Sequence, residues 1–161
     1  MEVHMVEMRA DGRPGEFFSW AEMETTSTGL ANRAPLSARN RLQVLAQCAL
    51  DPLRRYLKRP IKVTSGYRSH AVNVRVRGSR NSWHKTGEAA DIKVEGLSAA
   101  ELVAAILEAG LSFDQVIGYA PSRGGHVHIQ ICAGVPSRHR MQLLWAPASG
   151  GYEAFTPPAA P

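Results

Sequence analysis

Two short stretches of the sequence hold residue types that can bind a metal ion. SWHKTGEAAD (residues 82–91) sets His84 and Asp91 seven positions apart, and HVHI (126–129) holds His126 and His128. Side chains two positions apart on a strand share a face, so His126 and His128 should project to the same side. Two imidazoles and a carboxylate suit tetrahedral zinc and leave one position open to water, as in catalytic rather than structural sites.

Each stretch alone is weak evidence, because histidine and aspartate are ordinary residues of loops, surfaces and cores. The spacing between them adds to the signal. Gly87 would let the chain reverse, and the small side chains of Ala89 and Ala90 would let Asp91 face back towards His84. The sequence therefore predicts that the two stretches meet at one metal site.

The helices that must position these residues follow from hydrophobic periodicity. Apolar residues recur at three-to-four spacing from Leu36 to Lys58, which predicts an amphipathic helix that is bent or broken near Pro52. AAELVAAILEAG (99–110) predicts a second helix, with Ser98 as its N-cap. FFSWAEM (17–23) should form a short helix against the domain.

Four stretches read as strands from their apolar and β-branched character. They are IKVTSGY (61–67), AADIKVEG (89–96), QVIGYA (115–120) and HVHIQIC (126–132). PSRGG (121–125) should join the last two as a hairpin, and RHRMQLLW (138–145) could add a final short element. Because helices and strands do not alternate strictly, we predict an α+β fold with a small, mostly antiparallel sheet flanked by helices.

Length and composition are those of one globular domain. The chain has 161 residues, of which 44% are hydrophobic and 20% are charged. We expect an irregular N-terminal arm (1–15), the domain itself (16–145) and a disordered Pro- and Ala-rich tail (146–161). The polar N-terminus does not resemble an export signal, and no apolar stretch is long enough to cross a membrane. Cys48 and Cys132 lie in apolar surroundings, which favours buried thiols over a disulfide.

The net charge of +5 is concentrated near the first candidate ligand. Five basic residues precede or flank it: Arg68, Arg75, Arg77, Arg80 and Lys85. They form either a solvated loop face or an electropositive site for an anionic partner. That partner could be nucleic acid or a substrate that carries carboxylates.

Several of these motifs together resemble peptidase family M15, the zinc D-Ala-D-Ala carboxypeptidases, whose fold is shared with the Hedgehog signalling domain. The resemblance covers residues 16–132. Within the family, the chain looks most like a phage and bacterial branch that has an FFSWAEM segment and a DPLR helix. The motifs that carry it are SGYRS (65–69), Asn73, GS (78–79), SWHKTGEAADI (82–92) and HVHI (126–129).

The resemblance implies roles for individual residues. It makes His84, Asp91 and His128 the zinc ligands. Arg68 matches an arginine that binds the substrate carbonyl or the oxyanion, although a structural ion pair with a nearby acid is an alternative role. Ser82 matches a serine that contacts the substrate or supports the loop, and a simple turn residue is its alternative role. Tyr67, beside Arg68, is a further candidate for substrate binding.

The general base does not carry over directly. In the family an acidic residue or a histidine precedes the last ligand by a few positions, and Gly125 stands where several members have the acid. His126 is therefore the candidate base, since histidine works well near neutral pH. Asp114 and Glu88 are the next acids to consider.

The resemblance implies a monomeric zinc metallopeptidase that hydrolyses an amide bond in peptidoglycan stem peptides. We expect it to be made in the cytoplasm without a signal peptide and to act at the bacterial wall after lysis or within a phage particle. One alternative is a catalytically silent zinc-binding module of the same fold. A nucleic-acid-binding protein is disfavoured, because the chain has no recognisable recognition helix or aromatic stacking platform.

Overall fold

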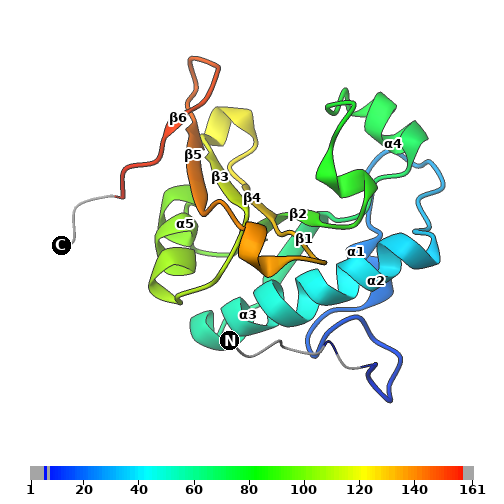
Figure 1. Ribbon diagram of the computed structural model, residues 1–161. Helices are drawn as coiled ribbons and strands as arrows, with labels where there is room; N and C mark the ends of the chain where they lie inside the picture. Colours follow the sequence, from blue (N-terminus) through cyan, green and yellow to red (C-terminus); the bar gives the residue numbers. More distant parts are fainter. Residues whose placement is uncertain (1–5, 7, 158–161) are drawn as a thin grey trace.

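One six-stranded sheet organises the protein (Figure 1). The computed structural model describes residues 6 and 8–157, and its strand order is β1-β2-β4-β3-β5-β6. Neighbouring strands are antiparallel except β3 and β5, which are parallel. The predicted α+β fold with a mostly antiparallel sheet is confirmed. The strands are β1 (Ile61–Ser65), β2 (Ala89–Val94), β3 (Gln115–Tyr119), β4 (Val127–Gln130), β5 (Gln142–Ala146) and β6 (Glu153–Ala154).

Of the five α-helices in the described part of the chain, α2, α3 and α5 lie on one face of the sheet (Figure 1). The helices are α1 (Trp20–Met23), α2 (Leu36–Leu45), α3 (Asp51–Leu57), α4 (His70–Arg75) and α5 (Ala99–Glu108). The predicted Ser98 cap of α5 is present as a reciprocal capping box with Glu101.

The predicted irregularity near Pro52 is a π turn. Residues Ala46–Leu50 widen the helical run between α2 and α3, and the N–H of Asp51 donates to the carbonyl of Ala46, five positions back. Proline has no N–H and crowds the preceding turn of an α-helix. The wider turn lets the helix continue through Pro52 without a break in its direction along the sheet.

Alternation along the strands separates a core face from a polar face. On the core side, Ala90 and Ile92 of β2 and Ile129 of β4 are fully buried and join one cluster with Leu42 of α2. The residues between them point to the other face. The strand pattern therefore sends Asp91 and the neighbouring histidine of β4 to the side of the sheet opposite α2, α3 and α5 (Figure 1).

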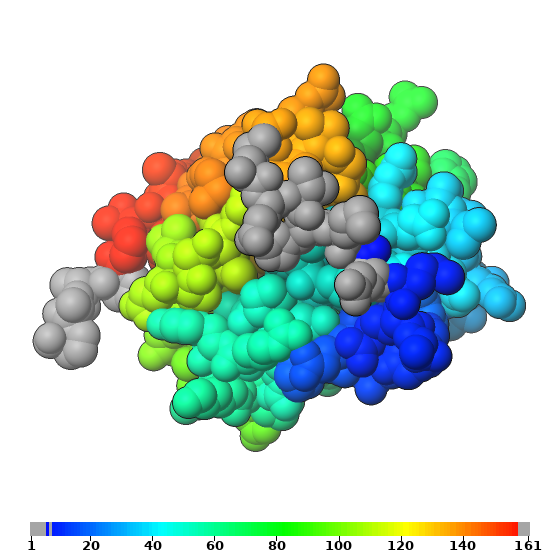
Figure 2. All heavy atoms as spheres, turned by 60° about the horizontal axis from the view of Figure 1, so that its bottom comes forward, coloured from blue at the N-terminus to red at the C-terminus, as the bar shows by residue number. Residues whose placement is uncertain are grey.

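The described part of the N-terminal arm, residues 6 and 8–15, forms no helix or strand. The segment that directly follows the arm is anchored on α3, where the buried carboxylate of Asp51 accepts hydrogen bonds from the backbone N–H groups of Glu16 (2.7 Å) and Phe17 (3.2 Å). Figure 2 shows α3 between the arm and α5 on this side of the molecule. Residues 1–5 and 7 of the predicted arm lie outside the described residues.

The prediction of a disordered tail from residue 146 is wrong for its described part. Ala146 ends β5, and β6 returns antiparallel to it, with Leu144 opposite Ala154 and Trp145 opposite Glu153. Proline, alanine and glycine suggested disorder, but the glycines form the turn of a hairpin that extends the sheet. Residues 158–161 of the predicted tail lie outside the described residues.

Two further expectations concern membranes and thiols. None of the helices in the described part of the chain combines the length and apolar character needed to cross a bilayer. Cys48 and Cys132 are both free, as predicted, and each is partly rather than fully buried. Burial raises the pKa of both thiols, which keeps them protonated near neutral pH.

Candidate metal centre

Asp91 and His128 face each other across two neighbouring strands of the sheet, β2 and β4. In the antiparallel register of β2 and β4 they are direct partners, and Asp91 also pairs with Ser65 of β1. Directly opposite side chains on one face lie within reach of each other. Nδ1 of His128 is 2.9 Å from Oδ1 of Asp91.

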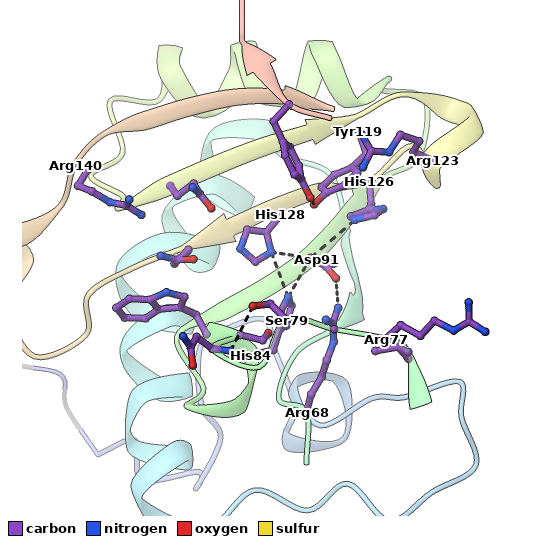
Figure 3. A pocket seen from close by; sticks show the side chains of 18 residues that line it. Arg68, Arg77, Ser79, His84, Asp91, Tyr119, Arg123, His126, His128 and Arg140 are labelled. Atoms are coloured by element: carbon purple, nitrogen blue, oxygen red, sulfur yellow. Dashed lines mark hydrogen bonds and ion pairs between the residues drawn. The ribbon is translucent and has the colours of Figure 1, made fainter. Parts of the chain in front are cut away.

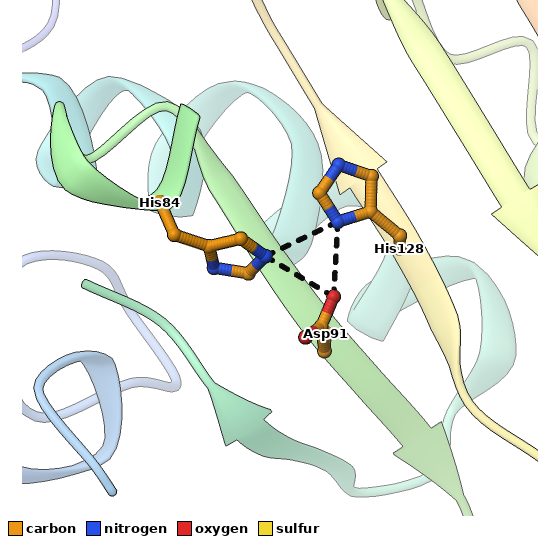
Figure 4. A group of neighbouring side chains, drawn as sticks. All are labelled: His84, Asp91 and His128. Atoms are coloured by element: carbon orange, nitrogen blue, oxygen red, sulfur yellow. Dashed lines mark hydrogen bonds and ion pairs between the residues drawn. The ribbon is translucent and has the colours of Figure 1, made fainter. Parts of the chain in front are cut away.

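His84 reaches the same point from the 3-10 turn Trp83–Lys85, which precedes β2. Gly87 makes this approach possible, because its φ of +82° is in the left-handed region and a Cβ there would lie 2.3 Å from the carbonyl oxygen of Ala38. Nε2 of His84 is 3.2 Å from Nδ1 of His128 and 3.2 Å from Oδ1 of Asp91. Figure 4 shows the three side chains converging on one point.

The geometry of this triad, His84, Asp91 and His128, fits zinc. Zinc bonds to nitrogen and oxygen of about 2.0–2.1 Å place tetrahedral ligand atoms about 3.3–3.4 Å apart. The three separations in the triad are 2.9–3.2 Å, so a small outward movement of the ligand atoms would accommodate the ion. Two nitrogens and one oxygen leave a fourth position for a water or a substrate atom.

Neighbouring groups hold two of the ligands in the form that a metal needs. Nδ1 of His84 lies 2.7 Å from the carbonyl oxygen of Gly66, so it carries the proton and leaves the lone pair on Nε2 for the metal. Nη2 of Arg68 donates to Oδ2 of Asp91 at 2.5 Å, while Nε of Arg68 donates to Oγ of Ser65 at 2.8 Å. Asp91 is thereby oriented with Oδ1 towards the histidines.

The pKa values also favour ligation. Burial lowers the pKa of His84 despite the nearby carboxylate, so the imidazole is neutral near pH 7. Burial opposes ionisation of Asp91, but its contacts with His84 and His128 outweigh that effect and hold its pKa well below the usual range. A neutral imidazole and an ionised carboxylate are the protonation states that bind a metal ion.

His126 lies beside the triad without belonging to it. It precedes β4, its Nε2 is 4.0 Å from Oδ1 of Asp91, and its side chain is 22% exposed. Its ring stacks on Tyr119 of β3, with centroids 4.3 Å apart and an interplanar angle of 17°. Burial lowers the pKa of His126 below its ordinary value, so the ring is neutral near pH 7 and can accept a proton.

A pocket of about 680 Å³ opens over the triad (Figure 3). Four arginines line it, whereas Asp91 is the only carboxylate among the described lining residues. Figure 3 shows Arg140 and Arg77 on opposite sides of the triad, so positive charge lies at both ends of the pocket. The arginines are Arg68, Arg77, Arg123 and Arg140.

Six of the seven predicted site residues meet in this pocket. They are Arg68, Ser82, His84, Asp91, His126 and His128. The structure does not bring Tyr67 there: its side chain is 8% exposed and packs in the hydrophobic core, and its carbonyl accepts from Asn32. Of the predicted basic cluster, Arg75, Arg80 and Lys85 do not line the pocket.

The two alternative acids are committed elsewhere. Glu88 accepts hydrogen bonds from Thr86 and from the backbone of Ala133. Asp114 accepts from the guanidinium of Arg140 and from Gln130. Neither acid lines the pocket, so His126 is the titratable side chain best placed beside the triad.

Several pocket residues were not anticipated from the sequence, among them Tyr119, Arg123 and Tyr152. Tyr119 could have been found, because alternation along β3 puts it on the same face as Ile117, the cross-strand partner of His128. No pattern in the sequence indicated that Arg123 or Tyr152 would reach the site.

One comparison with known proteins identifies a family. The model of the family described as Peptidase M15 matches residues 17–130, more than half of the chain. The matched segment contains the whole triad, His126 and Arg68, and it ends before Arg140 and Tyr152. No curated protein sequence matches the chain.

Proposed function

The chain belongs to the peptidase M15 family, and we propose that it is a zinc-dependent peptidase that hydrolyses an amide bond in peptidoglycan stem peptides. The observation that carries the proposal is the convergence of His84, Asp91 and His128 at the floor of a pocket that holds a neutral histidine and four arginines. His84, Asp91 and His128 would hold the zinc ion.

When bound, zinc lowers the pKa of a coordinated water to about 7 and polarises the scissile carbonyl. His126 accepts a proton from the attacking water as the water adds to the carbonyl carbon. The same imidazolium then donates that proton to the leaving amine, so the base is regenerated. Arg68 orients Asp91, and its Nη1, which makes no hydrogen bond within the described chain, can donate to the oxyanion.

The charge of the pocket supports an anionic substrate. Stem peptides carry free carboxylates, and guanidinium groups bind carboxylates through paired hydrogen bonds. Arg77 is exposed and has no ion-pair partner among the described residues, whereas Arg140 is paired with Asp114. Arg77 is therefore the arginine most available to a substrate carboxylate.

The proposal also covers the bond that is cleaved, the place where the protein acts and its oligomeric state. The bond cleaved is either the terminal D-Ala-D-Ala amide or a cross-link amide. The protein acts as a monomer at the bacterial cell wall, which it reaches after lysis or within a phage particle. A phage-encoded wall-degrading enzyme would meet its substrate by this route.

One observation favours the alternative of a catalytically silent zinc-binding module. The lining residues within the described chain offer no carboxylate besides Asp91, and Gly125 supplies no side chain where an acidic base could stand. The enzyme therefore depends on His126 for proton transfer. If His126 does not perform it, the triad only stabilises the fold.

Digestion of purified peptidoglycan and of defined muropeptides, read by mass spectrometry, tests the proposed function. Zinc-loaded protein should release peptide fragments that each carry a new amine and a new carboxylate, and His128→Ala should release none. Full zinc loading without any peptide product would favour the silent module. The masses of the products also identify the bond that is cleaved.

A further inference from the structure

The hairpin formed by β5, residues 147–152 and β6, here called the C-terminal hairpin, contributes one wall of the pocket. Its tyrosine, Tyr152, lines the pocket although 57% of its surface remains exposed. The hairpin lies outside residues 17–130, the segment that matches the family. This wall is therefore a feature of the chain that family membership does not account for.

Arg123 on the turn between β3 and β4 fastens the hairpin to the pocket. Its Nη1 donates to the carbonyl oxygens of Gly151 (2.7 Å) and Pro147 (3.4 Å). Its guanidinium carbon also lies 5.3 Å from the ring centre of Tyr152 and 5.5 Å from that of Tyr119. Cation–π contacts of this kind attract the guanidinium to the faces of the two rings.

Tyr152 meets Tyr119 directly. The two hydroxyl oxygens are 3.4 Å apart, and the rings meet edge to face at 87° with centroids 6.3 Å apart. Tyr119 in turn stacks on His126, which lies 4.0 Å from a carboxylate oxygen of Asp91. A continuous row of rings thus leads from the metal triad to the rim of the pocket.

The turn of the hairpin is built for this placement. Gly150 and Gly151 have φ values of +96° and +72°, a region that other residues seldom adopt, and they immediately precede Tyr152. Strand pairing fixes the chain directly after Tyr152, because Glu153 of β6 pairs with Trp145 of β5, which in turn pairs with Gly118 of β3. Tyr152 is therefore held at the rim from both sides.

We propose that Tyr152 and Tyr119 form a binding subsite for the part of a peptide substrate that extends from the scissile amide towards the β3–β4 turn. The inference rests on the proposed function and adds a specificity determinant to it. A preordered, exposed aromatic ring loses little conformational freedom when a ligand covers it, and tyrosines of this kind often dominate binding. The two hydroxyl groups and Arg123 suit a polar chain with amide groups and a carboxylate.

The test compares short and extended peptides. The zinc-loaded full chain should hydrolyse a stem peptide extended on one side of the scissile bond better than the minimal dipeptide. Tyr152→Ala should reduce kcat/KM about tenfold more for that extended peptide than for the dipeptide, and the extra loss should lie mainly in KM. Tyr152→Phe, which keeps the ring and removes only the hydroxyl, should lose less on the extended peptide than Tyr152→Ala.

Tyr56→Ala is the matched control, because Tyr56 is similarly exposed on α3 and does not line the pocket. Equal losses on both peptides in Tyr152→Ala, or a fall in kcat alone, would overturn the subsite and assign Tyr152 a structural role. No loss on either peptide would also overturn it.

Calorimetric titration of the extended stem peptide into zinc-loaded wild type and Tyr152→Ala keeps the two proposals separate. Absence of hydrolysis by the wild type would contradict the proposed function. A dissociation constant raised about tenfold in the variant would still support the subsite. Equal dissociation constants in the two proteins would overturn it.

Discussion

Replacing Arg68 by alanine should weaken zinc binding as well as hydrolysis. The side chain of Arg68 is 16% exposed, and its Nη2 donates to Oδ2 of Asp91 at 2.5 Å. Without Arg68, the carboxylate of Asp91, which is 10% exposed, loses the charged partner that orients it. Ser65, the cross-strand partner of Asp91 that accepts from Nε of Arg68, carries no charge that could replace the guanidinium.

A hydrogen bond to a charged group contributes about 1.5–3 kcal/mol. Because about 1.4 kcal/mol corresponds to a tenfold change in an equilibrium constant, zinc affinity should fall about 10- to 100-fold. Loss of a group that orients a metal ligand has effects of the same order. Turnover should fall further, by about 10²–10³, if Nη1 also donates to the oxyanion.

Competition titration against a chromogenic zinc chelator measures the affinity, and thermal unfolding of the zinc-free protein checks that the variant folds. Ser65→Ala is the matched control, since it removes the partner of Nε and retains the bond from Nη2 to Asp91. Its zinc affinity should fall less than that of Arg68→Ala. An unchanged zinc affinity in Arg68→Ala, together with a large loss of turnover, would refute the positioning role and leave only the oxyanion role.

Three further predictions concern the base, an ion pair and a turn. His126→Ala should keep its zinc and lose about 10²–10⁴ in turnover, whereas His128→Ala should lose zinc as well; near-full hydrolysis by His126→Ala would remove it as the base. The hydrogen bonds from the guanidinium of Arg140 lower the pKa of the Asp114 carboxylate. The ionised carboxylate therefore contributes stability above the unfolded-state pKa of about 3.9, and this contribution is lost as the pH falls through the lower folded-state pKa. In urea unfolding, Asp114→Asn should therefore lose about 1–3 kcal/mol at pH 7, and the difference from the wild type should shrink in acid; a difference independent of pH would contradict this. Gly87→Ala should destabilise the fold and weaken zinc binding more than Gly110→Ala, because both glycines have positive φ but only at Gly87 would a Cβ meet the backbone; equal thermal shifts would contradict the steric argument.

The sequence predicted that His84, Asp91 and His128 come together, because local rules determine where these side chains lie. Alternation along β4 put His126 and His128 on one face, and the small residues between His84 and Asp91 indicated a close approach. The register of β2 and β4 brings these groups together, and the buried apolar face of the two strands specifies that register, because a slip of one residue would turn the core residues to the polar face. The cap at Ser98 and the irregularity near Pro52 followed from similarly local chemistry.

The walls of the pocket could not be predicted in the same way, because contacts between distant segments form them. Arg123 and Tyr152 meet only after β5 has joined β3 in parallel and β6 has turned back onto β5. Composition pointed the other way, since residues 146–161 are rich in proline, alanine and glycine. The glycine pair at 150–151 between two apolar stretches was the local signal of a hairpin.

Tyr67 was predicted to bind substrate because it neighbours Arg68 in the sequence, but the structure places it away from the pocket. It precedes Arg68 in the SGYRS motif, but its backbone N–H donates to Met23 and its ring enters the core. Arg68 points the other way, into the pocket. Adjacent residues of an extended segment face opposite sides, so sharing a motif did not imply sharing a site.

The zinc content of wild type and Asp91→Ala, purified in parallel without added metal, tests the central claim most directly. If His84, Asp91 and His128 hold the ion, elemental analysis should find about one zinc per wild-type chain and far less in the variant. After removal of the metal, added zinc should restore activity only to the wild type. Equal zinc in the two proteins would contradict the assignment of the metal centre.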